Sequence, residues 1–357
     1  MSVQQGGACS LVDVTPGMEL AKAILRDNGK ILLTEGTVLT ETLIQRLRGQ
    51  GVSHIHIKGE SGPDLTAFDR PPSPLRLDFQ RKHDAVTQTM QRTFDAVRRF
   101  KKIPTREMNQ VVEEALLPMV NTAGALNYLQ RDRSVDEYTF VHSVNVGIMA
   151  GVLGHWLGYK APQLKELTLA GLLHDMGKTQ IPLPVLNKPL RLTDEEMKVM
   201  RLHPIIGYKL AQDSGVISND VSLAILQHHE RMNGSGYPSG VKKERIHPYA
   251  KILAVVDTYD AMTSDRVFKS KATPLSVIKI MLEEMYDRLD PDVCTVFLDN
   301  LKDCFVGNVV ELSDGREAEI LYFGSVFTPA PVLRTRQGEF INLSGPEALD
   351  IVRIIAG

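Results

Sequence analysis

The sequence predicts a mainly α-helical protein with a small α+β domain at residues 1–60 and a short β appendage with a tail at residues 305–357. Across residues 77–304, apolar residues recur at spacings of three and four, which is the period of amphipathic helices. In the two flanking parts, short apolar runs alternate with polar residues and turn signals, which is typical of strands. Residues 61–76 are rich in glycine and proline and are predicted to form a linker.

Several elements of the flanking parts can be placed. Asp27–Gly29 has the composition of a hairpin turn between two strands. The segment Glu41–Arg48 has the apolar spacing of one helix, which Gly49 would end. In the C-terminal part, Ser313–Gly315 is predicted to be a turn between two strands, and residues 347–357 to form a short final helix or tail.

Composition and charge exclude several classes of function. The formal net charge is −2 and the pI is about 6.6, so no basic field favours DNA, RNA or an anionic membrane as a partner. The three cysteines, Cys9, Cys294 and Cys304, lack the spacing of a thiolate zinc site or a disulfide framework, which favours a reducing compartment. The first residues lack the pattern of a signal peptide, and no apolar run has membrane-spanning length. A cytoplasmic protein is therefore expected.

Histidines and aspartates are concentrated in the helical region. The candidate ligands are His142, His174, Asp175, His203, His228, His229 and Asp257. Any one histidine on an apolar helix is more often a hydrogen-bonded core residue than a ligand. Burying the whole set would cost roughly 1–3 kcal/mol for each group left unpaired, a cost that a metal removes. Imidazole and carboxylate suit iron, manganese, nickel and zinc, and a carboxylate that bridges two ions is a common way to activate water for attack on phosphorus.

A second set of residues has the chemistry to bind a phosphorylated ligand. Lys178 follows His174 by about one helical turn and can meet a phosphate oxygen. Arg266 and Lys269 are three residues apart, on one face if helical, and can hold a second phosphate. Tyr237 lies in the glycine-rich loop NGSGYP and can stack on a base or bind a phosphate. Each of these features alone is more often a solvated surface or an ordinary turn.

The segments HDMGK and HHERMNGSGYP together resemble the HD-GYP subgroup of the HD phosphohydrolases. The resemblance runs from about residue 136 to 300, with His203-Pro204, Asp257 and Arg266 in the expected order. It implies an all-helical HD-type bundle that hydrolyses cyclic di-GMP to pGpG and in some members to GMP. Members with a third metal carry a glutamate one helical turn before the first histidine. This chain has Tyr138 there, which predicts two metals.

The resemblance also implies a role for each site residue. One ion would be bound by His142, His174, Asp175 and Asp257, and Asp175 would bridge to a second ion bound by His203, His228 and His229. Asp175 and Lys178 would be catalytic, and Lys178, Tyr237, Arg266 and Lys269 would contact the substrate. Iron or manganese is the expected metal, with nickel or zinc as the alternative.

Two other functions stay open on the sequence. One is an HD hydrolase that acts on another nucleotide, such as cyclic GMP-AMP. The other is a receptor or scaffold that binds a cyclic dinucleotide without cleaving it, although a complete ligand set argues for catalysis. A diguanylate cyclase as partner and a homodimer are further possibilities that no residue decides.

Overall fold

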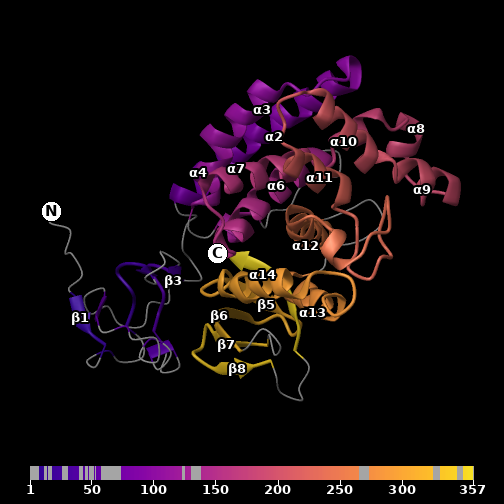
Figure 1. Cartoon of the computed structure of the whole chain (residues 1–357). Helices are drawn as coiled ribbons and strands as arrows, with labels where there is room; N and C mark the ends of the chain where they lie inside the picture. The colour runs from indigo at the N-terminus through magenta and orange to yellow at the C-terminus, as the bar shows by residue number, and fades with distance from the viewer. Residues whose placement is uncertain are drawn as a thin grey trace. The chain divides into compact units, whose positions relative to one another are not determined.

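The computed structural model describes residues 8–11, 14, 18–25, 31–39, 43–44, 47, 52, 54–57, 74–122, 125–129, 138–264, 273–324, 330–343 and 349–356. The chain divides into two compact units, one of residues 73–301 and one that comprises residues 1–72 and 302–357 (Figure 1). The predicted hairpin turn at 27–29 and residues 61–73 of the linker predicted at 61–76 lie outside the described residues. No helix in the described part of the chain is both long and apolar enough to span a bilayer.

The unit of residues 73–301 is helical, as the sequence predicts. Its elements are α2 (Pro74–Phe100), α3 (Thr105–Val111), the π-turn η2 (Val112–Leu116), α4 (Leu117–Val120), α5 (Ala125–Tyr128), α6 (Tyr138–Trp156), α7 (Ala161–Leu173), the 3₁₀ turn η4 (Met176–Gln180), α8 (Leu183–Leu186), α9 (Asp194–Met200), α10 (His203–Asp213), α11 (Asn219–Gln227), the 3₁₀ turn η5 (Lys243–Arg245), α12 (Pro248–Thr263), α13 (Pro274–Glu284) and α14 (Pro291–Asp303). Helix α14 crosses the boundary between the units.

Glycines allow the two central helices, α6 and α7, to pack closely. A Cβ atom on Gly171 of α7 would lie 2.7 Å from the Cα atom of Gly147 in α6. Contacts this short are possible only where neither residue has a side chain. Valine, isoleucine and leucine side chains along both helices are fully buried, so this pair forms the centre of the helical core.

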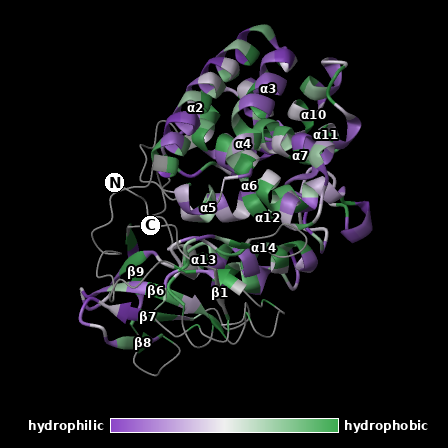
Figure 2. Ribbon diagram, turned by 90° about the vertical axis from the view of Figure 1, so that its left-hand side faces the viewer, coloured by the Kyte–Doolittle hydropathy of each residue, from purple (hydrophilic) through white to green (hydrophobic). Residues whose placement is uncertain are grey.

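Helix α2 packs one face against α6. Its buried residues recur mostly at helical spacing and are Phe79, His83, Val86, Met90, Thr93, Phe94 and Val97. Figure 2 shows that polar and apolar residues alternate around this helix, as an amphipathic helix requires. The helix begins at Pro74, inside the predicted linker, because proline fits the first turn of a helix, where its missing N–H would have no partner.

The N-terminal part contains short antiparallel strands around a small apolar core. Strand β1 (Ala8–Ser10) pairs with β4 (His54–His56), and β2 (Ile24–Leu25) pairs with β3 (Ile31–Leu33). Of the helix predicted at 41–48, the structure describes residues 43, 44 and 47, and all three are helical. Its Ile44 and Leu47 are buried together with Leu20 and Leu39, which form the centre of this core.

The C-terminal part is an antiparallel sheet with the strand order β8-β7-β6-β5-β9. The strands are β5 (Val309–Leu312), β6 (Glu317–Phe323), β7 (Pro331–Thr335), β8 (Phe340–Asn342) and β9 (Ile351–Ala356). The predicted turn connects β5 to β6, and its Gly315 has a φ of 83°, a conformation that favours glycine. The final helix or tail predicted at 347–357 is wrong for 351–356, because the β-branched run Ile-Val-Arg-Ile-Ile instead pairs with β5.

Candidate metal centre

Helix ends and the middles of two helices carry the seven candidate ligands. Near the ends of α7, α10 and α11 lie His174 with Asp175, His203, and His228 with His229, whereas His142 and Asp257 lie within α6 and α12. The structure brings all seven together. They form two groups, one of His142, His174 and Asp257 and one of Asp175, His203, His228 and His229. Within each group the ligand atoms lie within 4.8 Å of one another, and every side chain except the partly exposed His229 is buried.

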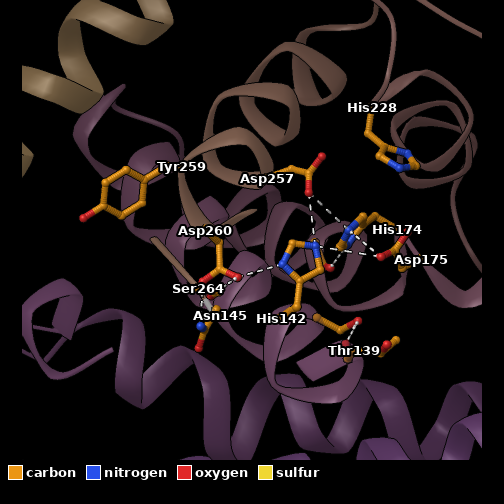
Figure 3. Close-up of polar contacts among 12 residues, drawn as sticks. Thr139, His142, Asn145, His174, Asp175, His228, Asp257, Tyr259, Asp260 and Ser264 are labelled. Atoms are coloured by element: carbon orange, nitrogen blue, oxygen red, sulfur yellow. Dashed lines mark hydrogen bonds and ion pairs between the residues drawn. The ribbon is translucent and has the colours of Figure 1, made fainter. Parts of the chain in front are cut away.

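Asp175 faces both groups at once. Its Oδ2 atom is 3.4 Å from Nε2 of His174 and 3.8 Å from Nε2 of His142, and its Oδ1 atom is 3.3 Å from Nε2 of His203. Figure 3 shows that Asp175 and Asp257 both lie near the Nε2 ends of the His142 and His174 imidazoles. A carboxylate with one oxygen toward each group is placed as a bridge between two cations would be.

Asp257 also spans the two groups. Its Oδ1 atom lies 3.1 Å from Nε2 of His142 and 3.9 Å from Nε2 of His174, whereas Oδ2 lies 3.7 Å from Nδ1 of His229. The sequence prediction places Asp257 with the first group alone. The structure adds a contact with His229, so both carboxylates connect the two halves of the centre.

Backbone hydrogen bonds fix which nitrogen of three imidazoles carries the proton. Nδ1 of His174, His203 and His228 lies 2.7, 2.9 and 2.7 Å from the carbonyl oxygen three residues earlier. Because a carbonyl only accepts, each Nδ1 must donate, and each Nε2 of a neutral ring then presents a lone pair to the centre.

Several acceptor atoms in the centre lack a donor. Nε2 of His203 and Nε2 of His228 are 3.3 Å apart, and with both Nδ1 atoms protonated neither Nε2 can donate to the other. Nε2 of His174 and Oδ1 of Asp175 are buried and have no hydrogen-bond partner among the described residues. Buried acceptors without donors are costly, and cations would satisfy them. The donor set therefore fits divalent first-row metals.

For three of the candidate ligands, His203, His228 and Asp175, the protonation states that burial and neighbouring charges favour are those of a metal site. Burial lowers the pKa of His203 to about 4 and that of His228 well below its ordinary value, so both rings are neutral. Burial opposes ionisation of Asp175, but the ammonium group of Lys178 outweighs it and holds the pKa of this carboxyl well below its usual range. Neutral imidazoles beside ionised carboxylates are the forms that bind metal.

His142 is oriented by a carboxylate that is not in either group. Nδ1 of His142 lies 2.7 Å from Oδ2 of Asp260, one turn further along α12 than Asp257 (Figure 3). Burial lowers the pKa of His142, but hydrogen bonds to Asp257 and Asp260 raise it to about 9. The sequence analysis missed Asp260, although a spacing of three from Asp257 indicates that both carboxylates share one helix face.

The structure places two of the four predicted substrate residues. The ammonium group of Lys178 is 2.5 Å from Oδ2 of Asp175, so it pairs with the carboxylate that faces both groups. The ring of Tyr237 lies 4.7 Å from that of His229, and the guanidinium of Arg201, another residue that the sequence analysis missed, is 5.2 Å from the Tyr237 ring centre. Arg266 and Lys269 lie outside the described residues.

Gly236 allows the loop that carries Tyr237 to fold back on the histidines. A Cβ atom on Gly236 would lie 2.4 Å from the carbonyl oxygen of His229 and 2.5 Å from the backbone nitrogen of Arg231. Only glycine permits this approach. The backbone nitrogen of Tyr237 then donates to the same His229 carbonyl at 3.2 Å, which fixes the tyrosine beside the centre.

Comparison with known proteins shows which proteins this chain resembles. Residues 120–293 match the family model described as HD domain. The chain is 34% identical over 308 residues to the cyclic di-GMP phosphodiesterase PA4108 of Pseudomonas aeruginosa, a match that covers 80% of this chain and 74% of that protein. It is 36% identical to the cyclic di-GMP phosphodiesterase response regulator RpfG of Xanthomonas campestris, over 52% of this chain and 47% of that protein.

Two further similarities bear on specificity and on fold. The 3'3'-cGAMP-specific phosphodiesterase 1 of Vibrio cholerae is 32% identical over 49% of this chain and 41% of its own length. Among solved structures, Bd1817, a HDG"Y"P protein from Bdellovibrio bacteriovorus, superposes with a TM-score of 0.52 at 20% identity, covering 83% of this chain and 99% of that chain. At this identity the likeness supports the fold alone.

Proposed function

The chain belongs to the HD-GYP family of HD-domain phosphodiesterases, and we propose that its two groups of histidines and aspartates hold two divalent metal ions for the hydrolysis of cyclic di-GMP. The protein is a metal-dependent phosphodiesterase. The observation that carries the proposed site is the position of Asp175, whose two oxygens face different groups at 3.3–3.8 Å from their imidazole nitrogens. Iron or manganese is the metal that we propose, with nickel or zinc as the alternative.

The bound ions would supply Lewis acidity and an activated water for in-line attack on a phosphodiester. Asp175 would hold the two halves of the centre together, and Lys178, paired with it, would stabilise negative charge that develops on the phosphate. Tyr237, whose partly exposed ring lies 4.7 Å from that of His229, would position the dinucleotide at the edge of the centre. Arg266 and Lys269 keep their predicted role at the second phosphate.

The experiment combines metal analysis with product analysis. The protein is purified anaerobically, its metal content is measured, and time courses are run on cyclic di-GMP and on 3'3'-cGAMP. We expect about two metals per chain and pGpG as the first product. Faster turnover of 3'3'-cGAMP would transfer the substrate assignment to that nucleotide, which the Vibrio cholerae relative makes the second candidate. Tight binding of either dinucleotide without product in metal-loaded protein would make the chain a receptor.

Substitution of the bridging carboxylate tests the site itself. Asp175→Asn removes the charge with little change of shape and is expected to abolish turnover and to lower the metal content. Asp213→Asn is the matched control, because Asp213 is exposed at the end of α10. Equal metal content and turnover in Asp175→Asn and wild type would remove this centre from consideration.

We also infer a cytoplasmic location, because the proposed substrate is an intracellular messenger. A diguanylate cyclase partner and a homodimer stay predictions of the sequence. Co-purification and light scattering test them.

A further inference from the structure

The buried residues of α2 include two polar ones, His83 and Thr93, and packing alone does not explain the position of His83. His83 is 3% exposed and lies between the apolar residues Phe79 and Val86 on the face that packs against α6. Burying an imidazole in an apolar face is unfavourable unless it forms hydrogen bonds. Its partners therefore indicate why it is there.

A line of hydrogen bonds leads from His83 to the metal centre. Nε2 of His83 is 2.9 Å from Oδ1 of Asn145, and Nδ2 of Asn145 donates to Oδ1 of Asp260 at 2.6 Å. Oδ2 of Asp260 is in turn 2.7 Å from Nδ1 of His142, whose Nε2 points toward Asp257 and Asp175. Figure 3 shows Asn145, Asp260 and His142 in this order. Three helices, α2, α6 and α12, contribute to the line.

The direction of each bond in this line is determined. Asn145 donates through Nδ2, so its Oδ1 accepts, and Nε2 of His83 must carry the proton. Nδ1 of His83 is then an acceptor, and the hydroxyl of Thr87 is 3.4 Å away as its donor. Asp260 accepts from both sides, which requires Nδ1 of His142 to donate and leaves Nε2 of His142 to bind a cation.

We propose that His83 is a positioning residue of the metal centre, which acts through Asn145 and Asp260 on the ligand His142. The inference rests on the proposed function in that it requires a metal at His142. His83 lies on α2, outside residues 120–293, which match the HD-domain family model.

The physical role of His83 is to select the orientation of an amide. An asparagine side chain presents either its oxygen or its nitrogen to a neighbour, depending on a half-turn of the amide. The N–H of His83 stabilises the orientation in which Oδ1 of Asn145 faces α2 and Nδ2 faces Asp260. With the opposite orientation, an oxygen would face Oδ1 of Asp260, the two acceptors would repel, and Asp260 would turn away from His142.

Two variants of His83 separate this role from simple packing. His83→Leu keeps an apolar side chain of similar bulk but removes the donor, and His83→Gln keeps an N–H donor. Met90→Leu is the matched control, because Met90 is fully buried on the same face of α2 and a Met-to-Leu exchange conserves volume. Zinc affinity is measured for each folded variant by competition with a chromophoric chelator, and the site geometry by the visible absorption of cobalt-loaded protein.

We expect His83→Leu to weaken zinc binding at the His142 group by up to about 10-fold, the lower end of the effect of losing a ligand's direct outer partner, because His83 acts through two intermediate residues. The cobalt spectrum should change, and kcat should fall at constant KM. His83→Gln should restore zinc affinity to within about threefold of wild type, and Met90→Leu should match wild type in every measurement. Wild-type zinc affinity and an unchanged cobalt spectrum in His83→Leu would overturn the inference, as would failure of a folded His83→Gln to restore them.

The design separates this inference from the proposed function. A wild-type protein that binds no zinc would refute the metal centre itself, whereas equal binding by wild type and His83→Leu would refute only the role of His83. If His83→Leu does not fold, nitrogen NMR of histidine-labelled, zinc-loaded wild type decides the question. A ring protonated at Nε2 of His83 supports the line of hydrogen bonds, and one protonated at Nδ1 overturns it.

Discussion

Gly177 is expected to tolerate no side chain, because the turn η4 lies directly against the start of α10. A Cβ atom at this position would lie 1.9 Å from the carbonyl oxygen of His203, 2.6 Å from the backbone nitrogen of Gly207 and 2.8 Å from the carbonyl carbon of His203. All three atoms belong to the backbone, so no side-chain rotation can relieve the contact. Gly177→Ala must therefore displace η4 and α10 from each other.

The size of that displacement follows from the contact. Ordinary van der Waals contact begins at 3.4 Å, so the two backbones must separate by about 1.5 Å in a close-packed interior. Asp175 lies on one side of this contact and His203 on the other, 3.3 Å apart between Oδ1 and Nε2. Metal–ligand distances tolerate only about 0.2 Å. We expect the second metal group to lose its ion and kcat to fall by about 100-fold or more.

The assay measures metal content, kcat and thermal stability of Gly177→Ala beside Gly154→Ala. Gly154 is also in the helical core, but a Cβ atom there would meet the side-chain ends of Leu167 and Leu164, which can move. Both variants should lose stability by about 1–3 kcal/mol through overpacking, but only Gly177→Ala should lose metal. Two metals and near wild-type kcat in Gly177→Ala would refute the reasoning.

Three other perturbations have expected outcomes. Burial lowers the pKa of His142, but two carboxylates raise it to about 9, so a metal that binds this ring must displace a proton. The metal affinity of the His142 group should therefore rise about tenfold per pH unit up to about pH 9 and then level off. Calorimetry in buffers of different ionisation enthalpy checks this, and pH-independent affinity would contradict it. Tyr237→Phe should raise KM by about tenfold or more if the hydroxyl binds a phosphate, with metal content unchanged; steady-state kinetics test it, and an unaltered KM would exclude the contact. Arg98 donates to the carbonyl oxygens of Ile181 and Lys178 at 3.3 and 3.4 Å. Arg98→Ala should lower the melting temperature by about 2–4 °C while both metals stay bound, and metal loss would show that this contact positions the centre.

The seven candidate ligands could be predicted from the sequence because most of them occur in short motifs. His174 and Asp175 are adjacent, as are His228 and His229. Such short motifs can be recognised without knowing how distant parts of the chain fold. The contacts between residues of different motifs could not be predicted from the sequence. The contact of Asp257 with His229 depends on how α12 packs against the end of α11, and no local pattern encodes it.

The residues that orient the candidate ligands through hydrogen bonds could not be predicted from the sequence for the same reason. The hydrogen bonds of Asn145 with His83 and Asp260 join residues 62 and 115 positions apart. Lys178 is a partial exception, since its spacing of three from Asp175 already allows the ion pair that the structure contains. The last strand was missed because its partner β5 is about forty residues earlier, and an isolated apolar run fits a helix or a strand equally well.

The ends of three helices explain how three of the candidate imidazole ligands are oriented. The carbonyl groups that accept from His174, His203 and His228 belong to the last turns of α7, α9 and α11. Carbonyls in a last turn have no partner within their own helix, so each imidazole N–H satisfies a group that would otherwise be unpaired. The same helix ends carry partial negative charge, which favours cations nearby. One contact thus stabilises the helix end, fixes the tautomer of the candidate ligand and would direct negative potential toward a bound metal. A histidine placed mid-helix has no such carbonyl available, and His142 accordingly depends on Asp260 instead.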